Sequence, residues 1–181
     1  MGKERDAEPV KLICGLLYRD SDTYESAINK LESMYGTIEF ESEHTEFVHS
    51  TYYKKEMGEG LIRTFISFSE AVSPERLSSM KRATNKLEQS FLDENNGRKI
   101  NIDPGYVSLA NLVLASTKDF SHRIYLEHGI YAEITLLYEN KRFTSLKWTY
   151  PDYQTDLTFD FLLRVRESLK DFILEHREKQ K

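Results

Sequence analysis

Apolar residues recur along the first hundred residues in segments whose spacing is typical of strands or helices. Lys11 to Tyr18 is apolar on both alternating faces, which predicts a strand buried in the middle of a sheet. Two longer segments, one ending at Gly36 and one beginning at Ser73, carry apolar residues at helical spacing and predict two helices. The predicted order is strand, helix, strand, strand, helix, strand, with the strands at 11–18, 38–43, 61–68 and 99–102.

That order is the order of a ferredoxin-like sheet, in which both helices cover one face. We therefore expect an α+β fold with a mainly antiparallel sheet. Asp103-Pro104-Gly105 then predicts a turn by its composition. Residues 107–115 fit a short helix or a buried strand, because periodicity does not separate the two at this length. Strands at 122–126, 130–138 and 142–148 extend the predicted core as a C-terminal hairpin or meander, and a C-terminal helix starts at Asp156.

The two strands that flank Glu127-His128-Gly129 have a register that the sequence predicts. We take these three residues as the loop, with Gly129 in the left-handed conformation. Apolar residues then face apolar residues, and opposite charges face each other. The predicted pairs are Leu126–Ile130, Tyr125–Tyr131, Ile124–Ala132 and Arg123–Glu133.

Length and composition indicate one domain. With 181 residues, of which 39% are hydrophobic, the chain can bury one core and not two. We expect residues 10–176 to form this domain, residues 1–9 to be a mobile leader and residues 177–181 to be a charged tail. The sequence has no apolar run long enough to cross a bilayer, no signal-peptide pattern and a single cysteine, Cys14, in an apolar run. We therefore expect a cytoplasmic protein without disulfides or membrane contact, and a buried thiol.

Charge and motifs exclude several classes of function. The net charge is −5, with 30 acidic and 25 basic residues, so we expect no bulk binding of nucleic acid. The sequence contains neither the G-x-x-x-x-G-K-[ST] motif of P-loop nucleotide hydrolases nor the G-x-S-x-G motif of serine hydrolases.

The densest run of polar groups lies between two apolar segments, at residues 116–123. Its hydroxyl, lysine, histidine and arginine side chains are groups that bind anions such as phosphate. The hairpin register adds a carboxylate and two tyrosines that would form one wall of a pocket. The predicted ligand-binding residues are Ser116, Thr117, Lys118, Asp119, His122, Arg123, Tyr125, Tyr131 and Glu133. The alternative is an ordinary turn, in which the short polar side chains bond to the turn backbone and Arg123 pairs only with Glu133.

Other segments carry weaker signals for chemistry. Asp103 and His122 are the candidate catalytic acid or base if the protein is an enzyme. The aromatic-rich loop Thr149 to Tyr153 either covers a pocket or packs on the core. We predict no metal site, because its ligands would have to come together from distant segments. The sequence identifies no cofactor.

Several strings occur together in this chain: NIDPGY from Asn101, LASTKD from Leu114, HRIYL from His122, GIYAE from Gly129 and WTYPDY from Trp148. In these strings the chain resembles an uncharacterised prokaryotic family known only as a domain of unknown function. The resemblance runs from about Val10 into the last helix. It implies a standalone bacterial or archaeal protein and no established activity. Members are sometimes labelled GTP-binding protein, which implies a class of ligand and no catalytic residue.

Two hypotheses of function follow. In the first, residues 116–123 bind a small phosphorylated or anionic ligand, with nucleotides among the candidates. In the second, the protein is a non-enzymatic interaction module or a homo-oligomer that uses a sheet face or edge, such as the exposed strand Ile38 to Glu43. The sequence contains no complete set of catalytic residues, so it does not decide whether the protein is an enzyme.

Overall fold

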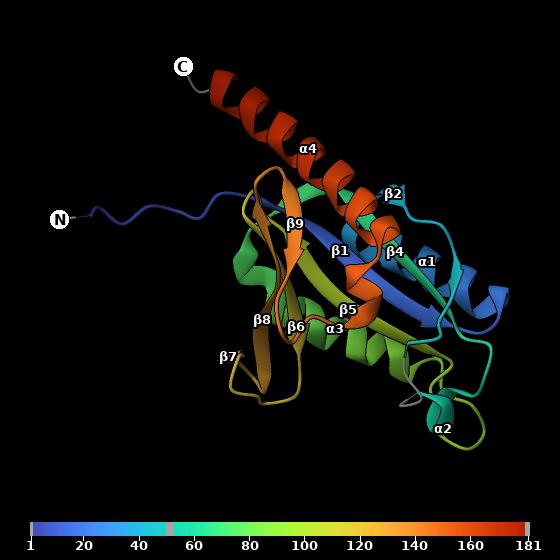
Figure 1. Cartoon of the computed structure of the whole chain (residues 1–181). Coiled ribbons are helices and arrows are strands. Elements are labelled where there is room, and N and C mark those ends of the chain that lie inside the picture. The colour runs from blue at the N-terminus through green and yellow to red at the C-terminus, as the bar shows by residue number, and fades with distance from the viewer. Residues whose placement is uncertain (1, 50–52, 180–181) are drawn as a thin grey trace.

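Strand β1 (Val10–Tyr18) is the centre of the structure, a computed structural model that describes residues 2–49 and 53–179 (Figure 1). All nine residues of β1 are buried, which confirms the predicted central strand. It pairs with β4 (Ile62–Val72) on one side and with β5 (Ile100–Val107) on the other. The remaining elements are α1 (Ser21–Tyr35), β2 (Ile38–Glu41), β3 (Thr45–Glu46), α2 (Lys54–Met57), η1 (Pro74–Arg76), α3 (Leu77–Gln89), β6 (Asn111–Ser116), β7 (Ile124–Glu127), β8 (Ile130–Glu139), β9 (Arg142–Ser145), η2 (Pro151–Gln154) and α4 (Asp156–Lys179).

Within the described residues, nine strands form one sheet in the order β2-β4-β1-β5-β6-β8-β7, with β3 beside β4 and β9 beside β8. Neighbouring strands are antiparallel. The first four strands in this order, with α1 and α3, form a ferredoxin-like core. β6 to β9 extend that core, and α4 follows them. The predicted α+β fold, with its ferredoxin-like core, C-terminal meander and C-terminal helix, is confirmed.

The sheet buries both of its faces. Side chains alternate along a strand, so Leu12, Cys14 and Leu16 of β1 pack against α1 and α3. Ile13, between them in the sequence, packs on the opposite side with Leu162 of α4. Figure 1 shows α4 crossing one face of the sheet while α1 and α3 lie behind the other. Cys14 is fully buried, and burial raises the pKa of its thiol.

Helix α4 begins at Asp156, where the sequence predicts its start. It continues to Lys179 and so includes residues 177–179 of the segment that we expected to be a charged tail. Its buried residues are Thr158, Phe161, Leu162, Val165, Leu169 and Ile173. Across residues 2–49 and 53–179, no helix has a stretch that is both long and apolar enough to span a membrane.

The segment Asp103-Pro104-Gly105 lies inside β5, so the predicted turn is wrong. β5 pairs with β1 without interruption over its whole length. Proline is tolerated at position 104 because the backbone nitrogen and carbonyl of Pro104, like those of Ile102, point away from β1 and toward the side of β6. The pairing of β6 with β5 ends at Gly105, so the N–H that proline lacks interrupts no hydrogen-bond ladder.

The segment that fitted either a helix or a strand contains a tight turn and a strand. β5 ends at Val107, and β6 begins at Asn111. Between them, the Ser108 hydroxyl accepts hydrogen bonds from the N–H groups of Ala110 and Asn111, both at 3.0 Å. This hydroxyl closes the turn, which places β6 antiparallel to β5.

The hairpin β7–β8 differs from the prediction at its tip. His128 and Gly129 have φ values of 50° and 75°, which is typical of a two-residue type I′ turn, so the three-residue loop is wrong. A bulge in β7 places Glu127, where we predicted Leu126, opposite Ile130. Beyond the bulge the predicted register returns, with Tyr125–Tyr131 and Ile124–Ala132 as confirmed pairs.

Candidate functional site

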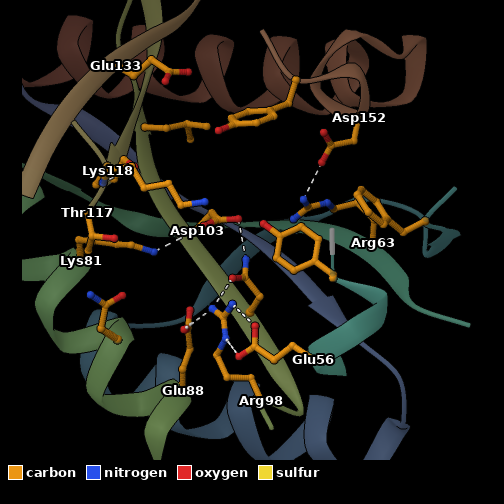
Figure 2. A pocket seen from close by; sticks show the side chains of 18 of the residues that line it. Glu56, Arg63, Lys81, Glu88, Arg98, Asp103, Thr117, Lys118, Glu133 and Asp152 are labelled. Atoms are coloured by element: carbon orange, nitrogen blue, oxygen red, sulfur yellow. Dashed lines mark hydrogen bonds and ion pairs between the residues drawn. The ribbon is translucent and has the colours of Figure 1, made fainter. Parts of the chain in front are cut away.

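A cavity of about 720 Å³ lies between β5 and β6 and is here called the β5–β6 cavity. The two strands pair only through Gly105–Leu114, Tyr106–Val113 and Val107–Leu112. Beyond Leu114, β6 stays paired with β8 and separates from β5. Residues of α2, α3, β4 and η2 close the space between the separated strands (Figure 2).

Side chains of α3 form hydrogen bonds with backbone groups of β5 at the edge that β6 leaves open. The N–H of Ile102 donates to Glu88 Oε1 at 2.7 Å, and Lys81 Nζ donates to the carbonyl of Ile102 at 3.0 Å. These bonds replace the ladder that β6 does not supply, as buried backbone groups require. Lys81, Asn85 and Glu88 are spaced four and three residues apart, so they lie on one stripe of α3 that lines the cavity. Burial raises the pKa of Glu88.

Asp103 lies at the centre of the cavity, and other side chains hold its carboxylate in place. Asn101 Nδ2 donates to Asp103 Oδ2 at 2.7 Å, and Lys81 Nζ lies 3.5 Å from Asp103 Oδ1. Arg98 Nη1 donates to the Asn101 amide oxygen at 2.8 Å, so the amide nitrogen is directed at Asp103. Glu56 accepts two hydrogen bonds from Arg98, at 2.6 and 2.8 Å. Figure 2 shows this chain of interactions ending at the Asp103 carboxylate.

A buried ion pair forms the wall opposite α3. Arg63 Nη2 of β4 lies 2.6 Å from Asp152 Oδ2 of η2, and both side chains are less than one-tenth exposed. Apart from this ion pair, Asp152 Oδ2 has no hydrogen-bond partner among the described residues. The same holds for Arg63 Nε and Nη1 and for the Tyr153 hydroxyl. Burial raises the pKa of Tyr153 well above its usual value.

Gly15 of β1 lies directly under this pair. A Cβ atom at position 15 would lie 2.7 Å from the Tyr153 hydroxyl oxygen and 3.1 Å from Arg63 Nη1. Gly15 pairs with Asp103 across the β1–β5 ladder, so the Asp103 side chain points to the same face of the sheet. The absence of a side chain at position 15 therefore lets η2 and Arg63 approach the sheet beside Asp103.

The wall formed by β6 and β8 contains the predicted pair of Arg123 and Glu133. Arg123 Nε donates to Glu133 Oε2 at 2.7 Å, and the two side chains are only 3% and 2% exposed. Arg123 Nη1 also donates to the Ser116 hydroxyl and to the Lys118 carbonyl, both at 2.9 Å. His122 Nε2 lies 3.1 Å from Glu133 Oε2, and its ring stacks on Trp148. These bonds occupy Arg123 within the wall and give it more partners than Glu133, the one partner that the turn alternative predicted.

Six residues named from the sequence line the β5–β6 cavity: Asp103, Ser116, Thr117, Lys118, Arg123 and Glu133. Figure 2 shows the side chain of Lys118 directed toward Asp103. Four others are not among the lining residues. Asp119 is exposed, His122 lies behind Glu133, and the rings of Tyr125 and Tyr131 contact each other on the hairpin.

The sequence analysis missed the half of the cavity that comes from β4, α3 and the start of β5. The missed lining residues include Arg63, Lys81, Asn85, Glu88, Arg98 and Asn101. The signal for α3 was present, since its polar residues repeat at helical spacing beside the apolar stripe. The aromatic-rich loop has both predicted roles, because Tyr150 to Tyr153 line the cavity and Tyr153 is also part of the core.

The described side chains around the cavity do not form a metal site. Among the described residues, no group of three or more His, Cys, Asp or Glu side chains has an arrangement that could hold a metal ion.

Comparison with known proteins gives a family and no activity. A family model described as Domain of unknown function (DUF4416) matches residues 8–169. This match confirms the resemblance to an uncharacterised family. No curated protein and no solved structure matches the chain.

The close packing of Tyr153 over Gly15 can be tested by adding a methyl group at position 15. Gly15→Ala should lower the free energy of unfolding by about 1–3 kcal/mol, because the new methyl group meets the Tyr153 hydroxyl. Tyr153→Phe alone should change the free energy of unfolding by less than about 1 kcal/mol, since the hydroxyl it removes has no hydrogen-bond partner. Urea unfolding of the double variant should show a smaller loss than Gly15→Ala alone. An equal loss in the single and double variants would contradict this packing.

Proposed function

The chain belongs to the family described as Domain of unknown function (DUF4416), and from the geometry of the β5–β6 cavity we propose that it binds a small anionic ligand there. The cavity has the size of a typical small-molecule site. Its volume is large enough for a sugar phosphate and too small for a folded partner.

The observation that carries this proposal is the approach of two lysines from opposite walls. Lys118 comes from the segment after β6 and Lys81 from α3, and Figure 2 shows both directed toward the centre of the cavity. Lysine ammonium groups are compact point charges that bind phosphate and carboxylate oxygens. A ligand between the two lysines would contact the predicted segment 116–123 through Lys118. Arg123 of the same segment would support the wall of the cavity.

Lys118 is the residue to replace in a test of anion binding. Lys118→Ala should weaken the binding of inorganic phosphate and ribose 5-phosphate about 10- to 100-fold, the effect of losing one charge-assisted hydrogen bond. Lys147→Ala is the matched control, because Lys147 is exposed and does not line the cavity. Isothermal titration calorimetry at low salt measures the affinity of both variants for the two ligands.

Arg123 is left in place in this experiment. Its removal would leave the Glu133 carboxylate, 2% exposed, without its closest cation and would destabilise the fold. Equal affinity of Lys118→Ala and the wild type would refute the proposed role of Lys118. A wild type that binds neither phosphate nor any phosphate ester would refute the proposed function.

A second candidate function is self-association through β7, which is an edge strand of the sheet. All four residues of β7 are exposed. Seven of the large hydrophobic side chains that are exposed lie on β7 or in the segments beside it: Phe120, Ile124, Tyr125, Leu126, Ile134, Trp148 and Tyr150. An apolar edge strand with unpaired backbone groups favours pairing with a second strand, and a second copy of this chain would provide one.

Self-association would change the mass of the protein in solution. If β7 pairs with β7 of a second copy, light scattering after size exclusion should give a dimer for the wild type and a monomer for Ile124→Lys. Leu174→Lys, on the exposed side of α4, should remain a dimer. A wild-type monomer at every concentration would exclude this second function.

A further inference from the structure

We infer that the wall of the β5–β6 cavity formed by Arg63, Asp152 and Tyr153 is a second subsite, which binds a neutral carboxamide group. This inference goes beyond the proposed function, because it concerns an uncharged group and does not depend on the lysines of the cavity. It rests on buried polar atoms whose hydrogen-bonding capacity is unused within the described part of the chain.

Four such atoms occur together on this wall. Arg63 Nε, Arg63 Nη1 and the Tyr153 hydroxyl can donate hydrogen bonds, and Asp152 Oδ2 can accept them. Apart from the ion pair between Asp152 and Arg63 Nη2, none of these atoms has a partner among residues 2–49 and 53–179. All three side chains are more than nine-tenths buried, so bulk water does not replace the missing partners. Unpaired polar groups in the interior cost free energy, and a cluster of four is a feature that the fold does not require.

Aromatic rings hold the guanidinium group of Arg63 in position. Its Cζ lies 5.4 Å from the ring centroid of Phe47, 5.5 Å from that of Phe65 and 5.8 Å from that of Tyr153. Ring faces attract a cation but are weak acceptors, so they do not replace hydrogen bonds to its N–H groups. Figure 2 shows the guanidinium directed into the cavity, on the side of Asp103. Arg63 is therefore fixed with donors left for a ligand.

The donors of Arg63 and Tyr153 come together over Gly15. The Cβ position of residue 15 is 2.7 Å from the Tyr153 hydroxyl oxygen and 3.1 Å from Arg63 Nη1. The two donors are therefore close enough for one ligand oxygen to accept hydrogen bonds from both. A carbonyl oxygen has the two lone pairs that such an arrangement requires.

Charge decides between a carboxylate and a neutral carbonyl group. Asp152 already balances the charge of Arg63, and Asp103 lies opposite Gly15 on the same face of the sheet. A carboxylate in the ligand would add a negative charge that this buried wall does not compensate. A carboxamide adds no charge, and its N–H group can donate to Asp152 Oδ2 while its oxygen accepts from Arg63 and Tyr153. One carboxamide group thus provides partners for all three residues.

The experiment compares three small probes of similar shape by NMR titration of the ¹⁵N-labelled protein. Propionamide carries the carboxamide, butan-2-one has a carbonyl group without a donor, and propionate carries a negative charge. The signal followed is the Nε–H of Arg63, which is identified by its loss in Arg63→Lys. Propionamide should shift this signal and bind about tenfold or more tightly than either other probe. Butan-2-one lacks the hydrogen bond to Asp152, and propionate is repelled by it.

Two variants test which residues recognise the carboxamide. Tyr153→Phe should weaken the binding of propionamide about 2- to 10-fold, the effect of losing one hydrogen bond. Tyr125→Phe is the matched control, because the Tyr125 side chain is exposed and does not line the cavity. Asp152→Asn removes the charge that repels propionate, so this variant should bind propionate more tightly than propionamide. If Asp152→Asn does not fold, the comparison of the two Tyr→Phe variants decides.

The outcomes that overturn the inference are distinct from a failure of the proposed function. If propionamide does not bind the wild type, or propionate or butan-2-one binds as tightly, the wall does not select a carboxamide. If Tyr153→Phe and Tyr125→Phe bind propionamide equally, the subsite does not include Tyr153, and the inference is wrong. None of the probes contains phosphate, so the phosphate titrations decide the proposed function separately.

Discussion

The early separation of β5 from β6 is the constraint on which the site depends. A sheet that continued its ladder would fill the space with backbone hydrogen bonds and leave no room for a ligand. Here β6 follows β8 away from β5 after three residue pairs, and α3 takes over the exposed backbone groups of Ile102 through Lys81 and Glu88. The fold thereby opens a cavity without leaving these groups of β5 unsatisfied, which would cost free energy.

Buried ion pairs hold the walls of this cavity in position. Arg123 joins the start of the hairpin to β8, Arg63 joins β4 to η2, and Arg98 joins α2, α3 and β5. Such pairs contribute little net stability, because removing charges from water offsets much of their attraction. Their effect here is geometric, since each one joins separate elements of the fold. The lysines and the carboxylate that approach the centre are therefore presented by a rigid frame.

The core of the fold could be predicted from the sequence because its signals are local. The apolar residues on both faces of β1 identified a central strand, and the hairpin register placed Arg123 beside Glu133. The cavity could not be predicted in the same way. Arg63 and Lys81 line the same cavity as Asp103 only after the chain has folded, and each had been assigned to an element with no chemical role. Asp103-Pro104-Gly105 has the composition of a turn, and only the missing ladder on one side of β5 makes proline acceptable in that strand.

The separation of the two strands can be observed directly by nuclear Overhauser effects in the isotope-labelled protein. Continuing the observed register would place Asp103 opposite Ser116. The structure predicts strong cross-strand contacts between Tyr106 and Val113 and none between the backbones of Asp103 and Ser116. It also predicts that the Ile102 amide proton exchanges slowly and loses that protection in Glu88→Ala. Backbone contacts between Asp103 and Ser116, with an Ile102 amide unaffected by Glu88→Ala, would show a continuous ladder, and the cavity would not exist.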